Sequence, residues 1–381
     1  MKEHLDFHPS EAQTAIAGLA REVLSRTVTE ESQRAVEATP DRFDRQLWRR
    51  LADANLLGVG IPEEFGGIGG GMLELCTLCE EIGRSVAWVP LWPVLAISGQ
   101  AISRWGTKAA KSSVLPELVR GGIVTAALTD AGSDDPARPA TEAKVAELGW
   151  TLTGSKLQVP FWDVSESVLI PAMVGSGVGL FRLARKAEGV RAVPQETTTG
   201  AMEWDLNLDN AACDPGDLLV EEEVGEAAMN WTLARATLAI CALHLGLADR
   251  MLEMTAEYTS NRRQFGRPIA TFQAVQQRLG DSYVDVQAMR WTMWQAAWSL
   301  DRGHDSSAEV AVAKAWASEA GQRVASACLH LHGGLGVDRS YPLHRYFLRS
   351  KQLELQVGSA TEHLSSLGTL LGAGSLPQYA N

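Results

Sequence analysis

The period of the hydrophobic pattern changes twice along this 381-residue chain, and this limits the folds that it can adopt. Over residues 10–120, and again from Gly225 onward, apolar residues recur every three to four positions, which is typical of amphipathic helices. Between them, short runs of β-favouring residues alternate with glycines. We therefore predict a mainly α-helical protein with an all-β middle domain. The predicted domain boundaries are residues 1–121, 122–224 and 225–381.

Individual elements follow from the same pattern. Helices are expected from Ser10, around residues 47–57 and over residues 72–86, and the glycine-rich segment 66–71 is expected to be a turn, because it fits no phosphate-binding loop. The predicted strands are residues 124–128, 151–152, 167–171, 178–183 and 218–220. The predicted C-terminal helices are residues 232–258, 272–300 and 307–330.

Charge and composition exclude several classes of partner. The chain has 34 Lys and Arg against 46 Asp and Glu, a formal net charge of -12, and such a surface repels nucleic acid. The first residues hold no apolar signal region, and the longest apolar run, residues 237–248, is shorter than the ~20 residues that span a bilayer. The five cysteines do not form a disulfide framework. We expect a cytoplasmic protein without membrane segments.

Two conspicuous patterns have ordinary structural interpretations. Cys76 and Cys79 lie in an amphipathic helix without further ligands at matching spacing, so two buried thiols are expected rather than a metal site. Trp291, Trp294 and Trp298 share one helical face, and such stripes pack in a core or against a subunit more often than they stack on a cofactor.

A basic segment at residues 261–269 is the first candidate binding site. A helix is expected to end near Arg262, followed by Phe265 and by Gln273 at the start of the next helix. A guanidinium can grip a pyrophosphate through two parallel hydrogen bonds. Cations are also favoured at any helix C-terminus, so by itself the segment leaves both interpretations open.

A glycine-rich segment after the last long helix is the second candidate. Gly333 and Gly334 follow His330 closely, and adjacent glycines let backbone amides approach a ligand without obstruction by side chains. An ordinary helix C-cap explains the same pattern and remains an alternative.

Together these segments resemble the acyl-CoA dehydrogenase family over essentially the full chain. An N-terminal signature around residues 47–67, a shortened TEPxxGSD-like loop at residues 129–134, and the two C-terminal motifs occur in the family's order. The resemblance implies an N-terminal helical domain, a β-barrel-like middle domain and a C-terminal four-helix bundle. It also implies FAD, an acyl-CoA substrate, and an electron-transfer flavoprotein or similar acceptor. The residues that it places on FAD are Arg262, Phe265, Gln273, His330, Gly333, Gly334, Thr129 and Ser133.

The family's chemistry requires a carboxylate to take the α-proton while the β-hydride goes to the flavin. In most members this base is a Glu immediately before a Gly near the C-terminus, and Val357 stands there. In other members the base lies on the first C-terminal helix, where this chain has Ala236. Neither residue can accept a proton, which leaves Glu354 and Glu362 as candidate substitutes.

Other departures fall on the same half of the family's flavin site. Gln158 occupies the position of the flavin-stacking tryptophan, whereas the motifs that reach FAD in a neighbouring subunit are retained. We therefore infer a non-catalytic subunit that completes the site of a paralogue with an intact Glu. It resembles the α2β2 enzymes of actinobacteria that desaturate CoA thioesters of steroid side chains. A homo-oligomeric dehydrogenase with a non-standard base, a flavin monooxygenase and a non-enzymatic scaffold remain alternatives.

Overall fold

The structure is a computed structural model that describes residues 8–133 and 135–373. The chain divides into two compact units, which are described separately. Unit 1 contains the described parts of residues 1–24, 72–87 and 237–381, and unit 2 contains residues 25–71 and 88–236. The predicted first domain is thus shared between the units, and the three-domain boundaries stay a prediction.

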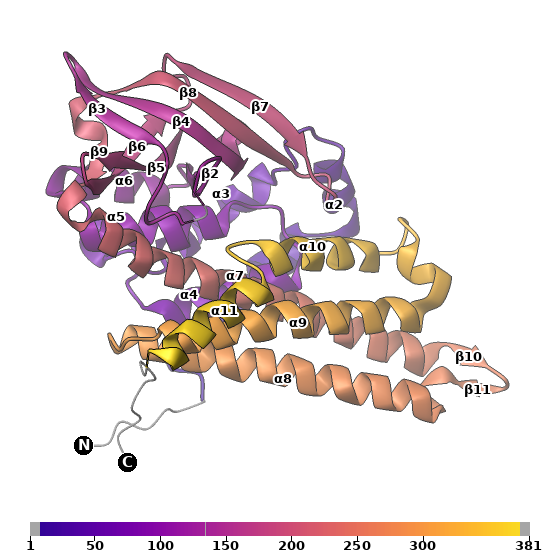
Figure 1. Cartoon of the computed structure of the whole chain (residues 1–381). Helices are drawn as coiled ribbons and strands as arrows, with labels where there is room; N and C mark the ends of the chain where they lie inside the picture. The colour runs from indigo at the N-terminus through magenta and orange to yellow at the C-terminus, as the bar shows by residue number, and fades with distance from the viewer. Residues whose placement is uncertain (1–7, 134, 374–381) are drawn as a thin grey trace. The chain divides into compact units, whose positions relative to one another are not determined.

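Unit 1 is helical, as predicted for the C-terminal part. Its first helix begins after Ser10, whose hydroxyl accepts the N–H of Gln13 at 3.1 Å and so caps a free donor. Figure 1 shows α8 and α9 running side by side, with the short strands β10 and β11 beyond one end of α8. Its helices are α1 (Glu11–Thr27), α4 (Met72–Arg84), α7 (Glu222–Asn261), η6 (Ile269–Thr271), α8 (Gln273–Asp301), α9 (Ser307–His332), η7 (Gly333–Val337), α10 (Leu343–Leu355) and α11 (Ala360–Gly372), and its strands are β10 (Arg263–Gln264) and β11 (Arg267–Pro268). Residues 25–27 of α1 and residues 222–236 of α7 belong to unit 2.

Helix α7 is longer than the predicted 232–258, because it begins at Glu222 and includes Gly225. No larger residue fits at this position, because a Cβ on Gly225 would lie 1.5 Å from the Val178 carbonyl oxygen. By length and composition α7 could cross a membrane, but 83% of its most apolar window is buried, as in the core helix of a folded protein.

Glycines also bring α4 and α7 into close contact within unit 1. A Cβ on Gly83 would lie 2.0 Å from the Leu243 carbonyl oxygen, and one on Gly246 would lie 1.9 Å from that of Glu80. The two backbones therefore touch at both points. Around this contact, Arg290 donates to the Glu80 carboxylate at 2.5 Å, which links α8 to α4.

Unit 2 contains a glycine-rich turn at residues 66–71. Gly66, Gly69 and Gly70 all have positive φ, so the predicted turn at residues 66–71 is confirmed. Beyond it lies a fully buried π-helix that the pattern did not predict. The helical segments are α2 (Glu30–Glu37), α3 (Arg45–Asp53), η1 (Leu56–Gly58), η2 (Glu63–Phe65), the π-helix η3 (Trp92–Gly99), α5 (Gln100–Trp105), α6 (Lys108–Val119), η4 (Trp162–Val164) and η5 (Pro215–Asp217).

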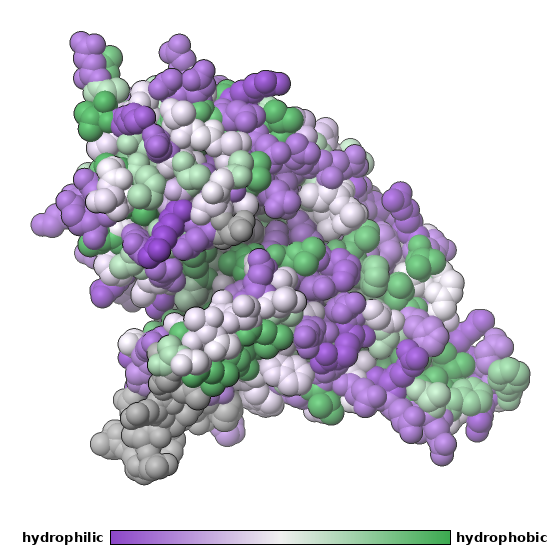
Figure 2. Space-filling model, in the orientation of Figure 1, coloured by the Kyte–Doolittle hydropathy of each residue, from purple (hydrophilic) through white to green (hydrophobic). Residues whose placement is uncertain are grey.

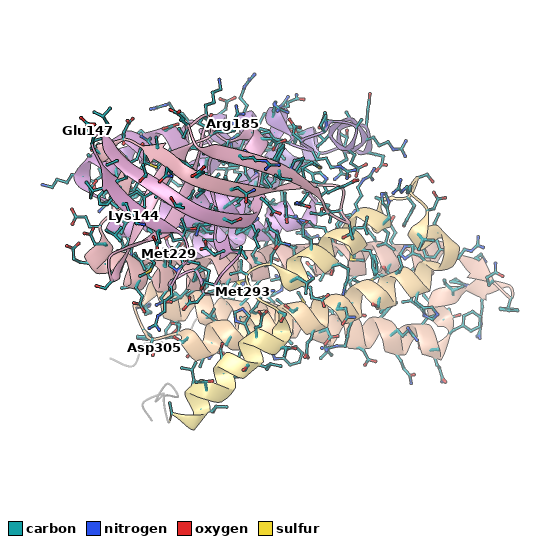
Figure 3. The ribbon with its side chains drawn as sticks, turned by 45° about the horizontal axis from the view of Figure 1, so that its top comes forward. Lys144, Glu147, Arg185, Met229, Met293 and Asp305 are labelled. Carbon is teal, nitrogen blue, oxygen red and sulfur yellow. The ribbon has the colours of Figure 1, made fainter. Side chains whose placement is uncertain are left out.

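The predicted β domain forms a nine-stranded mixed sheet in unit 2. Its main path is β7-β8-β4-β3-β5-β6-β9, with β1 parallel to β5 and β2 antiparallel to β4. Lys144 and Glu147, labelled in Figure 3, are exposed on the β3–β4 hairpin. The strands are β1 (Val124–Ala126), β2 (Thr129–Asp130), β3 (Glu142–Ala146), β4 (Gly149–Pro160), β5 (Ser167–Val174), β6 (Gly177–Ala184), β7 (Val190–Glu196), β8 (Met202–Cys213) and β9 (Leu218–Val220).

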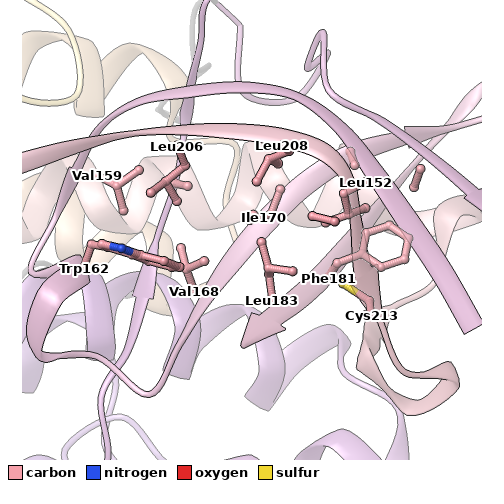
Figure 4. Packing of buried hydrophobic residues seen from close by; sticks show 14 residues of the cluster. Leu152, Val159, Trp162, Val168, Ile170, Phe181, Leu183, Leu206, Leu208 and Cys213 are labelled. Atoms are coloured by element: carbon pink, nitrogen blue, oxygen red, sulfur yellow. The ribbon is translucent and has the colours of Figure 1, made fainter. Parts of the chain in front are cut away.

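The core of this sheet comes from alternate positions of its strands, since successive side chains point to opposite faces. Figure 4 shows the cluster, in which Ile170 and Leu183 face Leu206 and Leu208. Phe181 is fully buried and meets Trp150 edge to face, with ring centroids 5.3 Å apart. The remaining labelled members of the cluster are Leu152, Val159, Trp162, Val168 and Cys213.

Candidate functional site

The basic segment forms a tight hairpin at the end of α7. Strands β10 and β11 pair in register, and the two residues between them, Phe265 and Gly266, have φ of +52° and +81°. Two-residue hairpin loops of this kind need positive φ at both central positions, which Gly adopts readily and Phe rarely does. The turn leaves the Phe265 side chain 91% exposed.

The three arginines of this segment are in different situations. The Arg263 guanidinium donates to the Gly266 carbonyl at 2.9 Å, and the Arg267 guanidinium lies over the Phe272 ring, 4.2 Å from its centroid. Arg262 is exposed, and no side-chain hydrogen bond or ion pair holds it among the described residues. Hydrophilic and hydrophobic side chains mix at this end of α8 (Figure 2). Arg262 is therefore the arginine available to an external anion.

Gln273 begins α8, as predicted, with Phe272 as its N-cap residue. The Gln273 side chain is exposed, and the φ of −81° and ψ of 132° at Phe272 end the hairpin segment. The structure thus exposes Arg262, Phe265 and Gln273 on one continuous segment of unit 1, in which residues 268–270 and Phe272 are half-buried.

The glycine loop at the end of α9 is open to solvent. Gly333 has φ +59° and ψ −139°, and a Cβ built on Gly333 or on Gly334 would meet nothing within 4 Å. Gly336 differs, since its Cβ would lie 2.9 Å from the Leu329 carbonyl oxygen. His330, one turn earlier, is exposed. The backbone of Gly333 and Gly334 can therefore be approached from outside, as the predicted anion site requires.

An aromatic stack, formed by Tyr258, His332 and Tyr341, brings the two segments together. The rings of Tyr258 and His332 are nearly parallel, with centroids 4.4 Å apart and an interplanar angle of 17°. The Tyr341 hydroxyl lies 3.2 Å from Nε2 of His332. Sequence reasoning missed His332, although its spacing of four residues from Cys328 at a helix end is a signal for a side chain bonding a terminal carbonyl.

Thr129 and Ser133 belong to unit 2 and to a different local structure. Thr129 is exposed on β2, and the Ser133 hydroxyl donates to the Arg138 carbonyl at 2.8 Å, which closes its own loop. Asp134 of the predicted loop lies outside the described residues. Beneath Thr129, the buried Asp130 carboxylate accepts from Lys156 Nζ at 2.5 Å, and burial lowers the pKa of Lys156 to about 8.

The positions expected for a base hold no free carboxylate. Val357 lies between α10 and α11 with φ +57°, and Ala236 is fully buried in α7. The Glu354 carboxylate accepts from Lys351 Nζ at 2.5 Å. The Glu362 carboxylate accepts the Ser359 N–H at 2.6 Å as part of the cap of α11, and this hydrogen bond lowers the pKa of Glu362. Both carboxylates thus have local structural partners.

The cysteine pair of α4 and the tryptophan stripe of α8 differ in burial. Cys76 and Cys79 are buried in α4, as expected, and burial raises the pKa of both thiols. Trp291, on α8, is 43% exposed, while Trp294 and Trp298 are half-buried, so the stripe is not core within unit 1. Of its two expected roles, packing against another subunit remains a prediction.

Gln158 lies at an irregularity of the sheet. It has φ +54°, its side chain is exposed, and the pairing of β4 with β8 shifts register between Lys156 and Val159. Its backbone N–H donates to the Asp205 carboxylate at 3.0 Å. The position predicted to have lost the flavin-stacking tryptophan is therefore a β-bulge, a feature that re-aims side chains and is common beside binding sites.

Comparisons with known proteins agree with this description. Acyl-CoA dehydrogenase FadE27 of Mycobacterium tuberculosis is 37% identical, over 96% of this chain and 98% of that protein. Among solved structures, the Tcur3481-Tcur3483 steroid ACAD variant is 41% identical (TM-score 0.87; 96% of this chain, 99% of that one). The ChsE4-ChsE5 complex from Mycobacterium tuberculosis is 36% identical (TM-score 0.91; 98% and 100%).

A more distant structure shows the fold alone. It is a glutaryl-CoA dehydrogenase from Mycobacterium smegmatis in complex with FADH2, 20% identical, with a TM-score of 0.88 over 97% of this chain and 96% of that one. Residues 10–122 match the acyl-CoA dehydrogenase N-terminal domain, and residues 224–368 match the acyl-CoA dehydrogenase C-terminal domain. The chain therefore belongs to the acyl-CoA dehydrogenase family.

Proposed function

We propose that this chain is a subunit of an FAD-dependent acyl-CoA dehydrogenase that has no catalytic base of its own and completes the FAD site of a paralogous partner. One observation carries the proposal. Unit 1 presents an exposed guanidinium at Arg262 and open backbone at Gly333 and Gly334, whereas Val357 and Ala236 stand where the family carries its base.

The exposed segments fit the phosphate part of FAD. A pyrophosphate needs cationic donors in a fixed fork and backbone amides that it can reach, and Arg262 with Gly333 and Gly334 offers both. Gln273 and His330 add exposed polar side chains on the same unit. Phe265, bare at the hairpin tip, offers an aromatic face to a partner. When FAD is bound, it supplies the hydride acceptor for α,β-desaturation of the thioester.

Thr129 and Ser133 of unit 2 are proposed to contribute to a flavin site through their loop. The ion pair of Asp130 and Lys156 anchors β2 at its second residue in the domain interior, directly before this loop. The chain's own part in the reaction is then to bind and orient FAD, while the α-proton must be removed by a carboxylate of the partner.

Glu354 and Glu362 support this division of labour. A general base should be free to take a proton and have a pKa near the working pH. Glu354 is paired with Lys351, and the capping role of Glu362 lowers its pKa, which makes that carboxylate a weaker base.

The partner and the substrate class rest on the relatives. Two similar solved structures carry two protein names each, and one of them is called a steroid ACAD. We propose a heterotetramer with a paralogue that carries the Glu, a substrate that is the CoA thioester of a steroid side chain, an electron-transfer flavoprotein or similar acceptor, and a location in the cytoplasm.

The test is to purify the chain alone and co-expressed with such a paralogue, and to measure bound flavin and acyl-CoA oxidation. The chain alone should retain little FAD and show no turnover, and Val357→Glu should not restore it, because catalytic groups that act as a unit do not contribute independently. Robust turnover by the isolated chain that is lost in Glu354→Gln or Glu362→Gln would establish the homo-oligomeric alternative instead.

A further inference from the structure

We infer that His332 is a positioning residue: through the aromatic stack with Tyr258 and Tyr341, it fixes the Arg262 hairpin relative to the Gly333–Gly334 loop, so that both meet one phosphate-bearing ligand. This inference rests on the proposed function, in which that ligand is FAD. It assigns a role to three side chains that need not touch the ligand themselves.

The stack reaches both segments through the backbone. The carbonyl of Tyr258 accepts the N–H of Arg262 at 2.8 Å, so the ring that His332 contacts lies one helical turn before the guanidinium. At the other end, His332 directly precedes Gly333, whose positive φ ends α9. A shift of the His332 ring would therefore move the last turns of two helices relative to each other.

The hydrogen bonds of His332 fix its tautomer and its ring plane. Nδ1 lies 2.9 Å from the Cys328 carbonyl, which can only accept, so Nδ1 carries the proton. Nε2 then accepts from the Tyr341 hydroxyl at 3.2 Å. His332 is only 3% exposed, and burial lowers its pKa, which favours the neutral ring that these two hydrogen bonds require.

Tyr341 extends the arrangement beyond the glycine loop. Its backbone carbonyl lies 2.7 Å from Nδ1 of His344, which must donate, so the start of α10 is tied to the same stack. The glycine loop is thereby anchored on both sides, at His332 before it and at Tyr341 after it. Glycines give the loop freedom of conformation, and the two anchors restrict it.

The test uses the co-expressed complex and a double-mutant cycle. His332→Leu removes the stack and both hydrogen bonds, and Tyr341→Phe removes one hydroxyl only. The dissociation constant of FAD and the visible circular dichroism of the bound flavin are measured for each variant alone and combined with Arg262→Ala. Tyr346→Phe is the matched control, because its hydroxyl donates to the Arg84 carbonyl at 2.8 Å and not to His332.

We expect His332→Leu to weaken FAD binding about tenfold and Tyr341→Phe about two- to fivefold, with an altered flavin spectrum, while Tyr346→Phe changes neither. With Arg262→Ala already present, each substitution should weaken FAD binding by a clearly smaller factor than it does alone, because a positioning residue acts through the group that it positions. Fully additive losses of FAD affinity in the double variants, or FAD binding left unchanged by His332→Leu and Tyr341→Phe, would overturn the inference. If His332→Leu prevents the complex from assembling, the double-mutant cycle of Tyr341→Phe with Arg262→Ala tests the inference instead. If Arg262→Ala itself has no effect, the proposed function fails as well.

Discussion

The ammonium of Lys156 lies 2.5 Å from the carboxylate of Asp130 in the interior of unit 2, where the two side chains are 0% and 1% exposed. The other partners of both groups are also buried: Lys156 donates to the Pro171 carbonyl at 2.8 Å, and the backbone N–H of Thr141 donates to Asp130 at 3.2 Å. The pair joins β2, β4 and β5 at one point. A buried pair stabilises little overall, but breaking it is costly.

Asp130→Ala should therefore lower the free energy of unfolding by about 3–5 kcal/mol, because it leaves a buried cation without its partner. Urea denaturation of the purified protein measures this. Glu226→Ala is the control, since the pair of Glu226 with Arg138 at 3.2 Å is exposed on both sides and should contribute less than about 1 kcal/mol. Equal losses in the two variants would show that the buried pair does not anchor β2.

Arg262→Ala in the co-expressed complex should weaken FAD retention about ten- to a hundredfold, because a hydrogen bond to a charged group contributes roughly 1.5–3 kcal/mol. Arg262→Lys should recover only part, since a point charge cannot reproduce the planar fork. Flavin content after gel filtration is the measurement.

The neighbouring arginines serve as controls for Arg262. Arg263 is bonded to the Gly266 carbonyl and Arg267 lies over the Phe272 ring, so alanine at either position should leave flavin content nearly unchanged. An assembled complex that keeps its flavin in the Arg262→Ala variant but loses it in the Arg263→Ala variant would reverse the assignment.

Gly246→Ala should strongly destabilise unit 1, because the new Cβ would lie 1.9 Å from the Glu80 carbonyl oxygen and would push α4 away from α7. Gly18→Ala, in the middle of α1, meets nothing within 4 Å and should stabilise by about 0.5–1 kcal/mol through helix propensity. Thermal unfolding of the two variants should shift in opposite directions. A similar downward shift in both would mean that the helices do not touch at Gly246.

The free energy of unfolding should decrease as the pH is lowered, because of His244. This side chain is fully buried, and its Nε2 lies 2.8 Å from the Ser350 hydroxyl. Burial and the nearby Lys314 lower the pKa of His244 to about 3. Between pH 6.5 and that value the unfolded chain binds a proton that the folded one rejects, so the free energy of unfolding should decrease by up to about 1.4 kcal/mol for each pH unit of acidification.

His244→Gln removes this titration while leaving the surface carboxylates unchanged. The difference in unfolding free energy between the parent protein and His244→Gln should therefore narrow as the pH is lowered from about 7 to about 4.5, the range in which the unfolded histidine takes up its proton. A constant difference would place the pKa of His244 near its ordinary value and its ring within reach of water.

Sequence patterns predicted elements whose periodicity is local and strong. The helices at 272–300 and 307–330 matched α8 and α9 to within two residues. Strands β7 and β8 were missed, because polar and charged residues interrupt them and several of their side chains are exposed. The π-helix η3 was missed because all eight of its residues are buried, so it has no polar face and no period to detect.

At the candidate site, too, the sequence predicted local motifs but not the contacts between distant segments. Arg262 and Gly333 lie in motifs that can be found in the linear sequence, and the structure exposes both. The contact of Tyr258 with His332 joins residues of different helices and follows only from tertiary packing. Gly225 misled the prediction of where α7 begins, since a residue that usually breaks a helix is retained there to make room for the Val178 carbonyl.

All five cysteines are buried, four in unit 1 and Cys213 in unit 2. Burial raises the pKa of Cys213 and Cys241 to about 12 and that of Cys328 to about 11. Because the thiolate is the form that reacts, we expect the buried thiols to resist alkylating reagents and mild oxidants in the folded chain. Each thiol becomes reactive only when its surroundings open, so mass-spectrometric labelling of individual cysteines would time the opening of the two units separately, with no probe added to the chain.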